Sequence, residues 1–469
     1  MHTKKHLITL ACLLTQISCT SVQPQRGFDD VQQDIAARIQ QQVHWKNGGP
    51  EDQQVAEKVR ALLQQPLTVE GAVQVALLTS PKLQATYENL GIAQATLVQA
   101  GLIQNPVFDI VARYPRGGGQ RNVDIDISHD FLSLLTLAMH KSISESDFEA
   151  TRLRVTGVVI DHALSVRQAF YQMQMAEQFK EMMAHVVLST AAALKAAQKL
   201  HAIGNMSAYA HDQYRNMHEE TLLMLADAEE MALMSREKIN QLLGLWGSAT
   251  AWTVANRLPV LPDGLVDLSH IEQKAIARSL DLAIKRHEMA VLAKQLGLTE
   301  RTRFLPDLEL GYAWERGDGE WEDGPSLSVQ IPIFDYGQAQ HAKRQAQMAQ
   351  LQRAYVDLAI NLRSEARMAA IRVRQAYAKA KHFERVLLPL RQRLVNGAQL
   401  EYNAMQIGVF KLLMARKKQI ATGQQYMLRL KTYWMAKATL DQLLSGKMVA
   451  TTNQGGMMTM ANDDNAGEH

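Results

Sequence analysis

Residues 326–337, S-L-S-V-Q-I-P-I-F-D-Y-G, decide the fold. Apolar and polar side chains alternate over residues 326–333, which predicts a strand with one aliphatic and one polar face. Pro332 cannot donate to a strand ladder, and Gly337 gives the backbone freedom to turn. The residues that follow are rich in Ala, Gln, Leu and Arg and carry no turn signal before Ile407-Gly408. A helix of about 65–70 residues, roughly 100 Å long, is therefore expected after the strand.

The same plan occurs earlier in the chain, so we interpret the sequence as a tandem duplication with a period of about 200 residues. Val166-Arg167-Gln168-Ala169-Phe170 recurs as Val373-Arg374-Gln375-Ala376-Tyr377, and Ile203-Gly204 recurs as Ile407-Gly408. Each half predicts one helix (67–103 and 268–304), two strands, a long helix and a shorter helix. The strands are expected at 107–114, 122–128, 307–314 and 326–333, with open loops between the members of each pair. The fold class is mainly α with a small β part.

The predicted domain order follows from this duplication. Residues 1–18 are expected to be a signal peptide, 19–66 a loosely held N-terminal arm, 67–246 the first repeat, 247–264 a linker, 265–446 the second repeat and 447–469 a disordered tail. The signal peptide rests on an apolar run of about eleven residues behind two lysines, which is too short to span a bilayer.

Composition excludes several classes of function. The chain has 469 residues and a formal net charge of only +3. No basic cluster is interleaved with aromatic residues, which argues against a nucleic-acid partner. No phosphate-binding loop, nucleophile-and-base set or Cys/His metal spacing is present. We therefore expect no enzyme activity, no catalytic residue, no cofactor and no resident metal.

The chain resembles the TolC-like outer-membrane efflux proteins, and the resemblance covers about residues 67–446. It is carried by the duplicated plan, the I-P-I-F-D-Y-G hinge, the opening of the first half from Leu67 to Leu83, and the approach from Tyr402 to Gly408. The first strand-to-helix junction, residues 127–131, departs from the pattern because it lacks the Pro and the Gly. Leu388-Pro389, inside the second long helix, resembles the heavy-metal branch, and Pro389 should kink that helix.

The resemblance implies a homotrimer with a trimeric α-helical periplasmic tunnel and one shared 12-stranded transmembrane β-barrel. It implies a location in the bacterial outer membrane, and a periplasmic adaptor protein and an inner-membrane pump as partners. Residues 16–18 before Cys19 resemble a lipobox, which implies lipidation of Cys19. The alternative is a chance cysteine beside an ordinary cleavage site.

The residues themselves also favour a barrel. A four-stranded sheet with one apolar face cannot close alone, and lipid accepts strands only in closed barrels. The lipid-facing side chains are expected to be Phe108, Ile110, Val123, Ile125, Leu308, Leu310, Val329 and Ile331. Tyr114, Trp314 and Trp321 are expected near the strand ends as an interfacial girdle. The alternative is a soluble sheet with one buried face.

The opposite face is expected to line a pore with Asp109, Arg113, Asp124, Asp126, Asp307 and Glu309. This acidic excess favours cations, and the preferred cargo is a soft or borderline metal such as copper or silver. The alternative is that these carboxylates only keep the pore wet. The turns at Ile203, Gly204, Ile407 and Gly408 are expected to be the tips that contact the adaptor.

Histidines and methionines gather near the first tip, where His201, His211 and His218 accompany Met206 and Met217. They form either a solvated helix face or a transient soft-metal site. The main functional hypothesis is an exit duct of a tripartite efflux pump. The leading alternative is a soluble periplasmic coiled-coil scaffold or adaptor without a pore.

Overall fold

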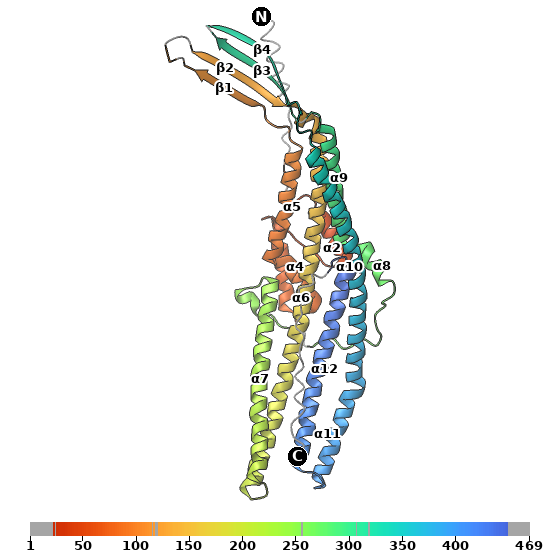
Figure 1. Cartoon of the computed structure of the whole chain (residues 1–469). Coiled ribbons are helices and arrows are strands. Elements are labelled where there is room, and N and C mark those ends of the chain that lie inside the picture. The colour runs from red at the N-terminus through yellow and green to blue at the C-terminus, as the bar shows by residue number, and fades with distance from the viewer. Residues whose placement is uncertain are drawn as a thin grey trace. The chain divides into compact units, whose positions relative to one another are not determined.

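A computed structural model describes residues 22–448, apart from 24, 115, 118–120, 255, 256, 306 and 318. Figure 1 labels the helices and strands of the chain. The chain divides into two compact units. Unit 1 comprises residues 1–163, 240–255 and 280–361, and unit 2 comprises residues 164–239, 256–279 and 362–469. Each unit draws on both halves of the sequence, because the two longest helical runs contribute to both units.

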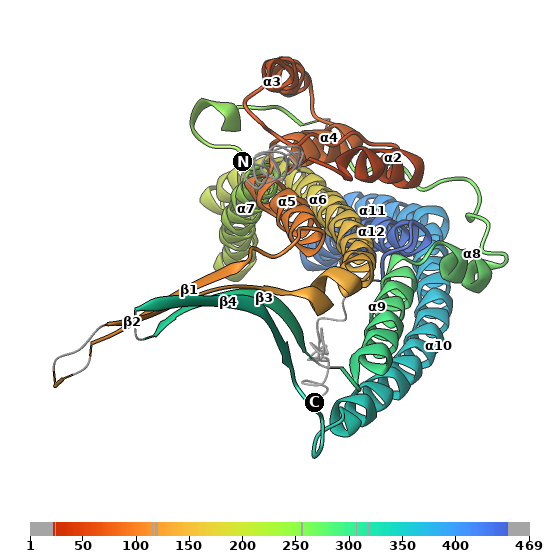
Figure 2. The ribbon, with the colours of Figure 1, turned by 90° about the horizontal axis from the view of Figure 1, so that it is seen from above.

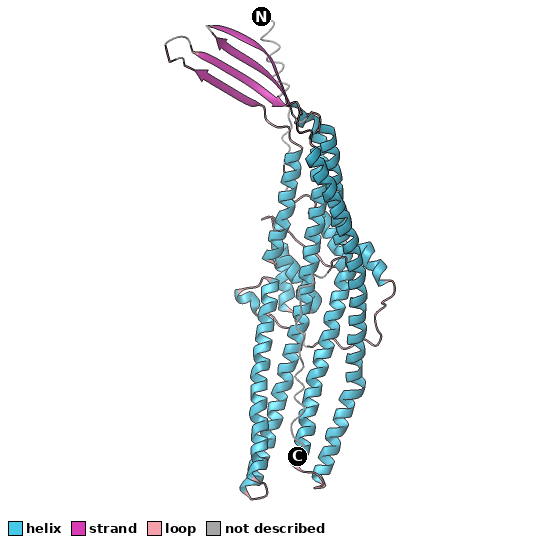
Figure 3. Ribbon diagram, in the orientation of Figure 1, coloured by secondary structure: helices cyan, strands magenta, loops and turns pink. Residues whose placement is uncertain are grey.

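Helices make up most of the described chain. They are α2 (Phe28–Ile39), α3 (Pro50–Gln64), α4 (Val69–Thr79), α5 (Pro81–Ala100), α6 (Phe131–Ala202), α7 (Ala208–Leu243), α8 (Ile271–Arg278), α9 (Leu280–Thr302), α10 (Gln338–His382), α11 (Leu388–Asn403) and α12 (Val409–Leu444). Figure 3 shows that the strands are confined to a single sheet. The order of elements repeats along the chain, as the duplication predicts.

The sheet lies in unit 1 and consists of β1 (Val107–Arg113), β2 (Asn122–Asp130), β3 (Leu308–Gly317) and β4 (Glu320–Val329). All neighbours are antiparallel in the order β1-β2-β3-β4, and the sheet is curved (Figure 2). The two central strands come from different halves of the sequence.

The prediction for the fourth strand was wrong at both ends. β4 begins at Glu320 and ends at Val329, so Ile331 and Ile333 lie beyond it. The segment expected as an open loop is mostly a hairpin, because Gly317 pairs with Glu320 and the strands continue inward from there. An Asp-Gly pair between strands is a strong hairpin signal, and it stands at 318–319. The many charged residues around this pair interrupt the alternation of apolar and polar side chains, so the sequence did not predict strands there.

The helix predicted before each pair of strands is in fact two helices. α4 starts where expected, since Thr68 caps it through a 3.1 Å hydrogen bond from the Gly71 amide to its hydroxyl. It ends at Ser80, whose ψ of 116° is extended, because Pro81 disfavours a helical residue before it. Ser279 breaks the second half in the same way, with the same ψ of 116°, although no proline follows it.

The N-terminal arm packs along α4 and α5, and it is held more firmly than the predicted loose segment. Phe28 lies between two aromatic rings, 5.7 Å from Trp45 and 5.0 Å from Tyr87 of α5. Side-chain amides also hold the extended segment between α2 and α3: Gln74 bonds both the amide and the carbonyl of Gln42, and Gln84 bonds the carbonyl of His44 at 2.9 Å. These contacts satisfy backbone groups that would otherwise be unpaired.

The long helices differ at one point. α6 is continuous over 72 residues, whereas a π-turn at Phe383–Leu387 separates α10 from α11 immediately before Pro389. Pro389 has no amide hydrogen, and its ring clashes with the carbonyl four residues earlier, so the wider turn relieves both conflicts. The π-turn thus lies at the point where Pro389 predicts a kink.

Each unit has its own core. Unit 1 buries Val31, Ile35, Leu77, Leu83, Tyr87, Leu90, Ile160 and Trp252, and unit 2 buries Phe170, Met173, Met183, Val373, Val395, Tyr433 and Leu440. Small side chains form the seam of α10, where Ala366, Ala369, Ala376 and Ala380 are buried. Alanine at such spacing lets helices approach closely with little entropy cost.

Candidate functional site

The register of the sheet places the predicted apolar side chains on one face. Phe108 pairs with Ile127, Ile110 with Ile125, Leu310 with Leu327, and Leu308 with Val329. Directly paired residues of an antiparallel sheet share a face. Phe108, Ile110, Val123, Ile125, Leu308, Leu310 and Val329 therefore lie together, and Ile331 follows the end of β4.

No part of the chain that the structure describes covers this apolar face. The exposed fraction is 59% for Phe108, 55% for Ile110 and 64% for Leu327. A contiguous exposed apolar patch indicates a surface that meets lipid or another protein. A soluble sheet with a buried face, which was the alternative, does not fit these exposures.

Aromatic and charged residues mark the hairpin end of the same face. Trp321 pairs with Arg316, whose guanidinium lies 5.9 Å from the indole ring, and Asp323 accepts a hydrogen bond from the Tyr312 hydroxyl. Trp314 was expected near a strand end but lies inside β3, opposite Asp323, because the hairpin continues beyond it. Tyr114 follows β1 and is exposed.

The opposite face carries the predicted polar residues. Asp109 pairs with Asp126, and Glu309 pairs with Ser328. Arg113 lies on this face with its guanidinium 2.7 Å from the Asp124 carboxylate, so part of the negative charge is neutralised locally. Asp307 precedes β3 by one residue.

Sequence reasoning missed further carboxylates on this polar face. They belong to the parts of β2, β3 and β4 that extend beyond the predicted strands, and Glu315 and Glu322 stand directly opposite one another. Continuing the alternation to the end of β2, and through the hairpin of β3 and β4, would have found these residues, which are Asp130, Glu315, Glu320 and Glu322.

The two helical turns of unit 2 reverse the chain with the same hydrogen-bond pattern. In the first turn the Asn205 amide bonds the Leu200 carbonyl, and in the second the Gln406 amide bonds the Glu401 carbonyl, both at 2.9 Å. Gly204 is left-handed with a φ of 77°. Such turns commonly end helices and place glycine at the left-handed position.

Gly408 does not occupy the same position in the second turn as Gly204 does in the first. Gly408 has a φ of −74° and precedes α12 as its N-cap, whereas Met405 holds the left-handed position with a φ of 57°. Gly204 therefore corresponds to Met405, and the recurrence of Ile-Gly in both turns does not reflect equivalent positions. Ile203 is 68% exposed and Met405 is 94% exposed.

A charge pair joins the two hairpins of unit 2. The Lys417 ammonium on α12 lies 2.9 Å from the Glu220 carboxylate on α7. Hydrogen bonding to Lys417 is the largest cause that lowers the pKa of Glu220 below its ordinary value. The basic stretch after the second turn is thus partly paired with acidic side chains of α7.

The histidines near the first turn separate into two groups. The rings of His201 and His211 stack with centroids 5.3 Å apart, whereas His218 bonds the Thr190 hydroxyl at 3.1 Å. No group of three or more His, Cys, Asp or Glu side chains that could hold a metal occurs among the described residues. Cys19 and most of the Met-bearing tail lie outside the described residues.

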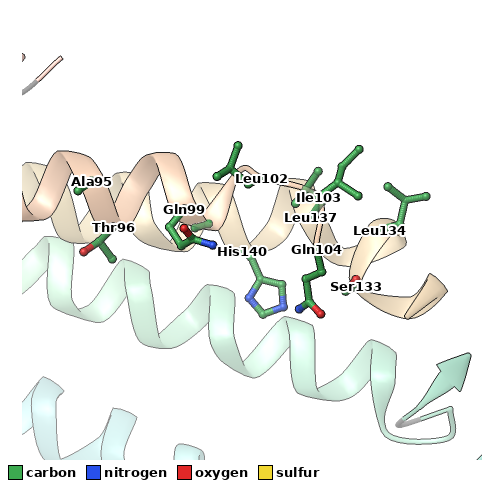
Figure 4. A pocket seen from close by; sticks show the side chains of 11 residues that line it. Ala95, Thr96, Gln99, Leu102, Ile103, Gln104, Ser133, Leu134, Leu137 and His140 are labelled. Atoms are coloured by element: carbon green, nitrogen blue, oxygen red, sulfur yellow. The ribbon is translucent and has the colours of Figure 1, made fainter. Parts of the chain in front are cut away.

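A hollow of about 630 Å³ in unit 1 is lined by α5, the segment after it and α6. Figure 4 shows its lining side chains. Leu102 and Leu134 point to one side of it, while Gln104 and His140 point to the other. The lining contains a single titratable group, His140, and no acid–base pair, so it has no arrangement suited to proton transfer or nucleophilic attack.

Within the described part of the chain, every helix is either too short or too polar to cross a bilayer.

Comparisons with known proteins agree with this architecture. No model of a known protein family matches the chain. Over 391 residues the chain is 24% identical to the cobalt-zinc-cadmium resistance protein CzcC of Cupriavidus metallidurans, a match covering 81% of this chain and 90% of CzcC.

Solved structures share the fold. A structure of CusC that describes transmembrane channel formation matches with a TM-score of 0.67 and 17% identity, covering 86% of this chain and 95% of CusC. The Campylobacter jejuni CmeC outer membrane channel matches with a TM-score of 0.69 and 15% identity, covering 82% and 86%. The resemblance to TolC-like outer-membrane efflux proteins is confirmed by this shared fold and by the likeness to CzcC.

Proposed function

We propose that the chain is the outer-membrane exit duct of a tripartite efflux system, which receives its cargo from an inner-membrane pump through a periplasmic adaptor. The observation that carries this proposal is the exposed apolar face of a sheet whose edge strands, β1 and β4, have no further strand partner among the described residues. Lipid can cover such a face only if the two edge strands are paired with further strands, because unpaired backbone N–H and C=O groups are very costly in hydrocarbon. Like the channels that it resembles, the chain is not an enzyme.

A homotrimer closes the edges most simply. When β4 of one copy pairs with β1 of the next, three copies form one 12-stranded barrel, the apolar faces turn outward and the carboxylate-bearing faces line the lumen. The four-stranded order β1-β2-β3-β4 supports this arrangement, since its first and last strands are the free edges. Lipidation of Cys19 would add an anchor to the same membrane.

The exposed turns of unit 2 are proposed as the adaptor-contacting tips. Ile203, Met405 and Ile407 offer apolar side chains, and Gly204 and Gly408 shape the two turns. Replacing Ile203 by Arg should abolish efflux and leave the amount of trimer in the membrane unchanged, because the side chain is 68% exposed and supports no core. Loss of the trimer in this variant would assign Ile203 to folding instead.

The proposed cargo is a metal cation. The lumen face would carry carboxylates at several heights, with Arg113 as a cation already paired to Asp124. Such a lining raises the local concentration of cations. The likeness to CzcC, named for cobalt, zinc and cadmium resistance, makes these borderline divalent ions the first candidates, ahead of the copper or silver favoured by the sequence.

Two measurements test the proposal. Fractionation distinguishes a channel from the soluble scaffold or adaptor: a channel should require detergent and run as a heat-labile trimer, whereas a scaffold should stay in the soluble periplasm. Deleting the gene should then lower tolerance to cobalt, zinc or cadmium and leave tolerance to dyes and detergents nearly unchanged. Lower tolerance to dyes and detergents with unchanged metal tolerance would refute the metal cargo, but it would still agree with an exit duct.

A further inference from the structure

The end of α6 and the start of α7 bring two histidine rings together in unit 2. His201 lies in the last turn of α6, His211 lies in the first turn of α7, and their ring centroids are 5.3 Å apart. The turn at Gly204 sets this approach, because it reverses the chain within a few residues. His201 is exposed, and the His211 side chain is 19% exposed, so solvent reaches the pair.

Hydrogen bonds fix which nitrogen of each ring carries the proton. His201 Nδ1 lies 2.8 Å from the Met206 carbonyl oxygen, and His211 Nδ1 lies 3.2 Å from a carboxylate oxygen of Asp212. Both partners can only accept, so both Nδ1 atoms must donate. In the neutral rings, both Nε2 atoms therefore keep a free lone pair.

The Nδ1 hydrogen bonds are of the kind that metal-binding histidines make. Such histidines almost always donate the other ring N–H to a carboxylate or a backbone carbonyl, which fixes the tautomer and raises the basicity of the ligating nitrogen. The pair has one partner of each kind. His218 of the same hairpin differs, because its Nδ1 bonds the Thr190 hydroxyl and its ring does not join the stack.

The spacing of the rings also suits one ion. Two imidazoles that bind a tetrahedral cation through nitrogens about 2.0–2.1 Å from the metal have ring centroids about 5.2 Å apart. The observed separation is 5.3 Å. In the stack the ring planes lie 22° apart, so the two Nε2 lone pairs do not yet point at one ion. Binding therefore requires both rings to rotate about their side-chain bonds, and the Nδ1 hydrogen bonds must shift with them.

We propose that His201 and His211 form a two-histidine docking site for a borderline divalent cation such as Zn²⁺ or Co²⁺. Imidazole nitrogen is a preferred ligand for such ions. Water completes the coordination, because the described residues supply no third His, Cys, Asp or Glu ligand here. A site with only two protein ligands binds weakly and releases readily, which suits a cargo that must pass on. The site deepens the proposed metal-efflux function and rests on it for its biological meaning.

The test is metal binding to the full-length purified protein in detergent, with Zn²⁺ measured by calorimetry and Co²⁺ by its visible absorption. His201→Asn and His211→Asn are the informative variants, because the Asn amide can keep the donated hydrogen bond while the Nε2 ligand is lost. Each should abolish His-dependent binding. His218→Asn is the matched control and should bind as the wild type does. Asp212→Ala should weaken binding by about tenfold, as loss of an orienting partner does.

The proposal is overturned if the wild type binds no more metal than the double Asn variant, or if His218→Asn loses binding equally. These outcomes differ from failure of the proposed function. Binding is measured on the isolated channel, whereas cargo is judged by metal tolerance of cells. If binding does not depend on the two histidines but deleting the gene lowers metal tolerance, only the docking site is refuted. If binding depends on the histidines but deleting the gene leaves metal tolerance unchanged, only the metal-efflux role is refuted.

Discussion

Replacing Val329 by Arg tests the orientation of the sheet. Val329 is on the apolar face of β4 and pairs with Leu308. On that strand the charged residue of the same face is Asp323, six positions away, and Trp321 lies beyond it. A rise of about 3.4 Å per residue and a tilt of about 40° place Val329 roughly 15 Å inward from Asp323 along the membrane normal.

That depth is close to the middle of an apolar band about 25 Å tall, where Arg costs about 2–4 kcal/mol. Each 1.4 kcal/mol is a factor of ten in an equilibrium constant, so the folded population should fall by about 30- to 700-fold relative to the unfolded one. The neighbouring Ser328→Arg is the matched control. Ser328 is on the polar face directly opposite Glu309, so a new guanidinium there gains a carboxylate partner and should change stability little.

Urea unfolding in lipid vesicles, followed by tryptophan fluorescence, measures both variants. The amount of heat-labile trimer in cell membranes provides an independent readout. Equal destabilisation by Val329→Arg and Ser328→Arg would refute the two-faced assignment, since only one face should meet lipid. A neutral Val329→Arg would show that this face is covered by something other than hydrocarbon.

Three further predictions concern the helical parts. Gly204→Ala should cost about 1 kcal/mol and Met405→Gly should relieve a similar strain, because both positions are left-handed at φ values of 77° and 57°; thermal unfolding would show the opposite signs. The pKa of Glu220 is lowered by Lys417, so this pair should stabilise the fold above the unfolded pKa near 4.5 and lose its contribution as pH falls through the folded pKa. Glu220→Gln should remove that acid-sensitive step in pH-dependent unfolding, with a small amplitude because the pair is exposed. Phe28→Ala should destabilise the arm by about 3 kcal/mol, seen as faster proteolysis of the arm, whereas cleavage elsewhere should stay at the wild-type rate.

The sequence alone determined the features that depend on local periodicity. Alternation over two positions located the four strands and assigned Phe108, Ile110 and Leu310 to one face. The long runs without turn signals predicted α6 and the α10–α11 run within a few residues. Pro389 marked the one irregularity in that second run, because its effect on the helix is purely local.

Tertiary structure decided whatever depends on partners distant in sequence. The pairing of β2 with β3 joins residues almost 200 positions apart and extends the hairpin past the expected loop, because strand length is set by the neighbouring strand rather than by the segment itself. The arm is ordered by Gln74 and Gln84, which meet it only after folding. Whether Gly408 or Met405 takes the left-handed position likewise depends on where α11 ends, and the residue type at either position does not reveal that. The meeting of His201 with His211 follows from the same kind of geometry, since the turn at Gly204 brings the two ring centroids to 5.3 Å, a distance that no spacing along the chain specifies.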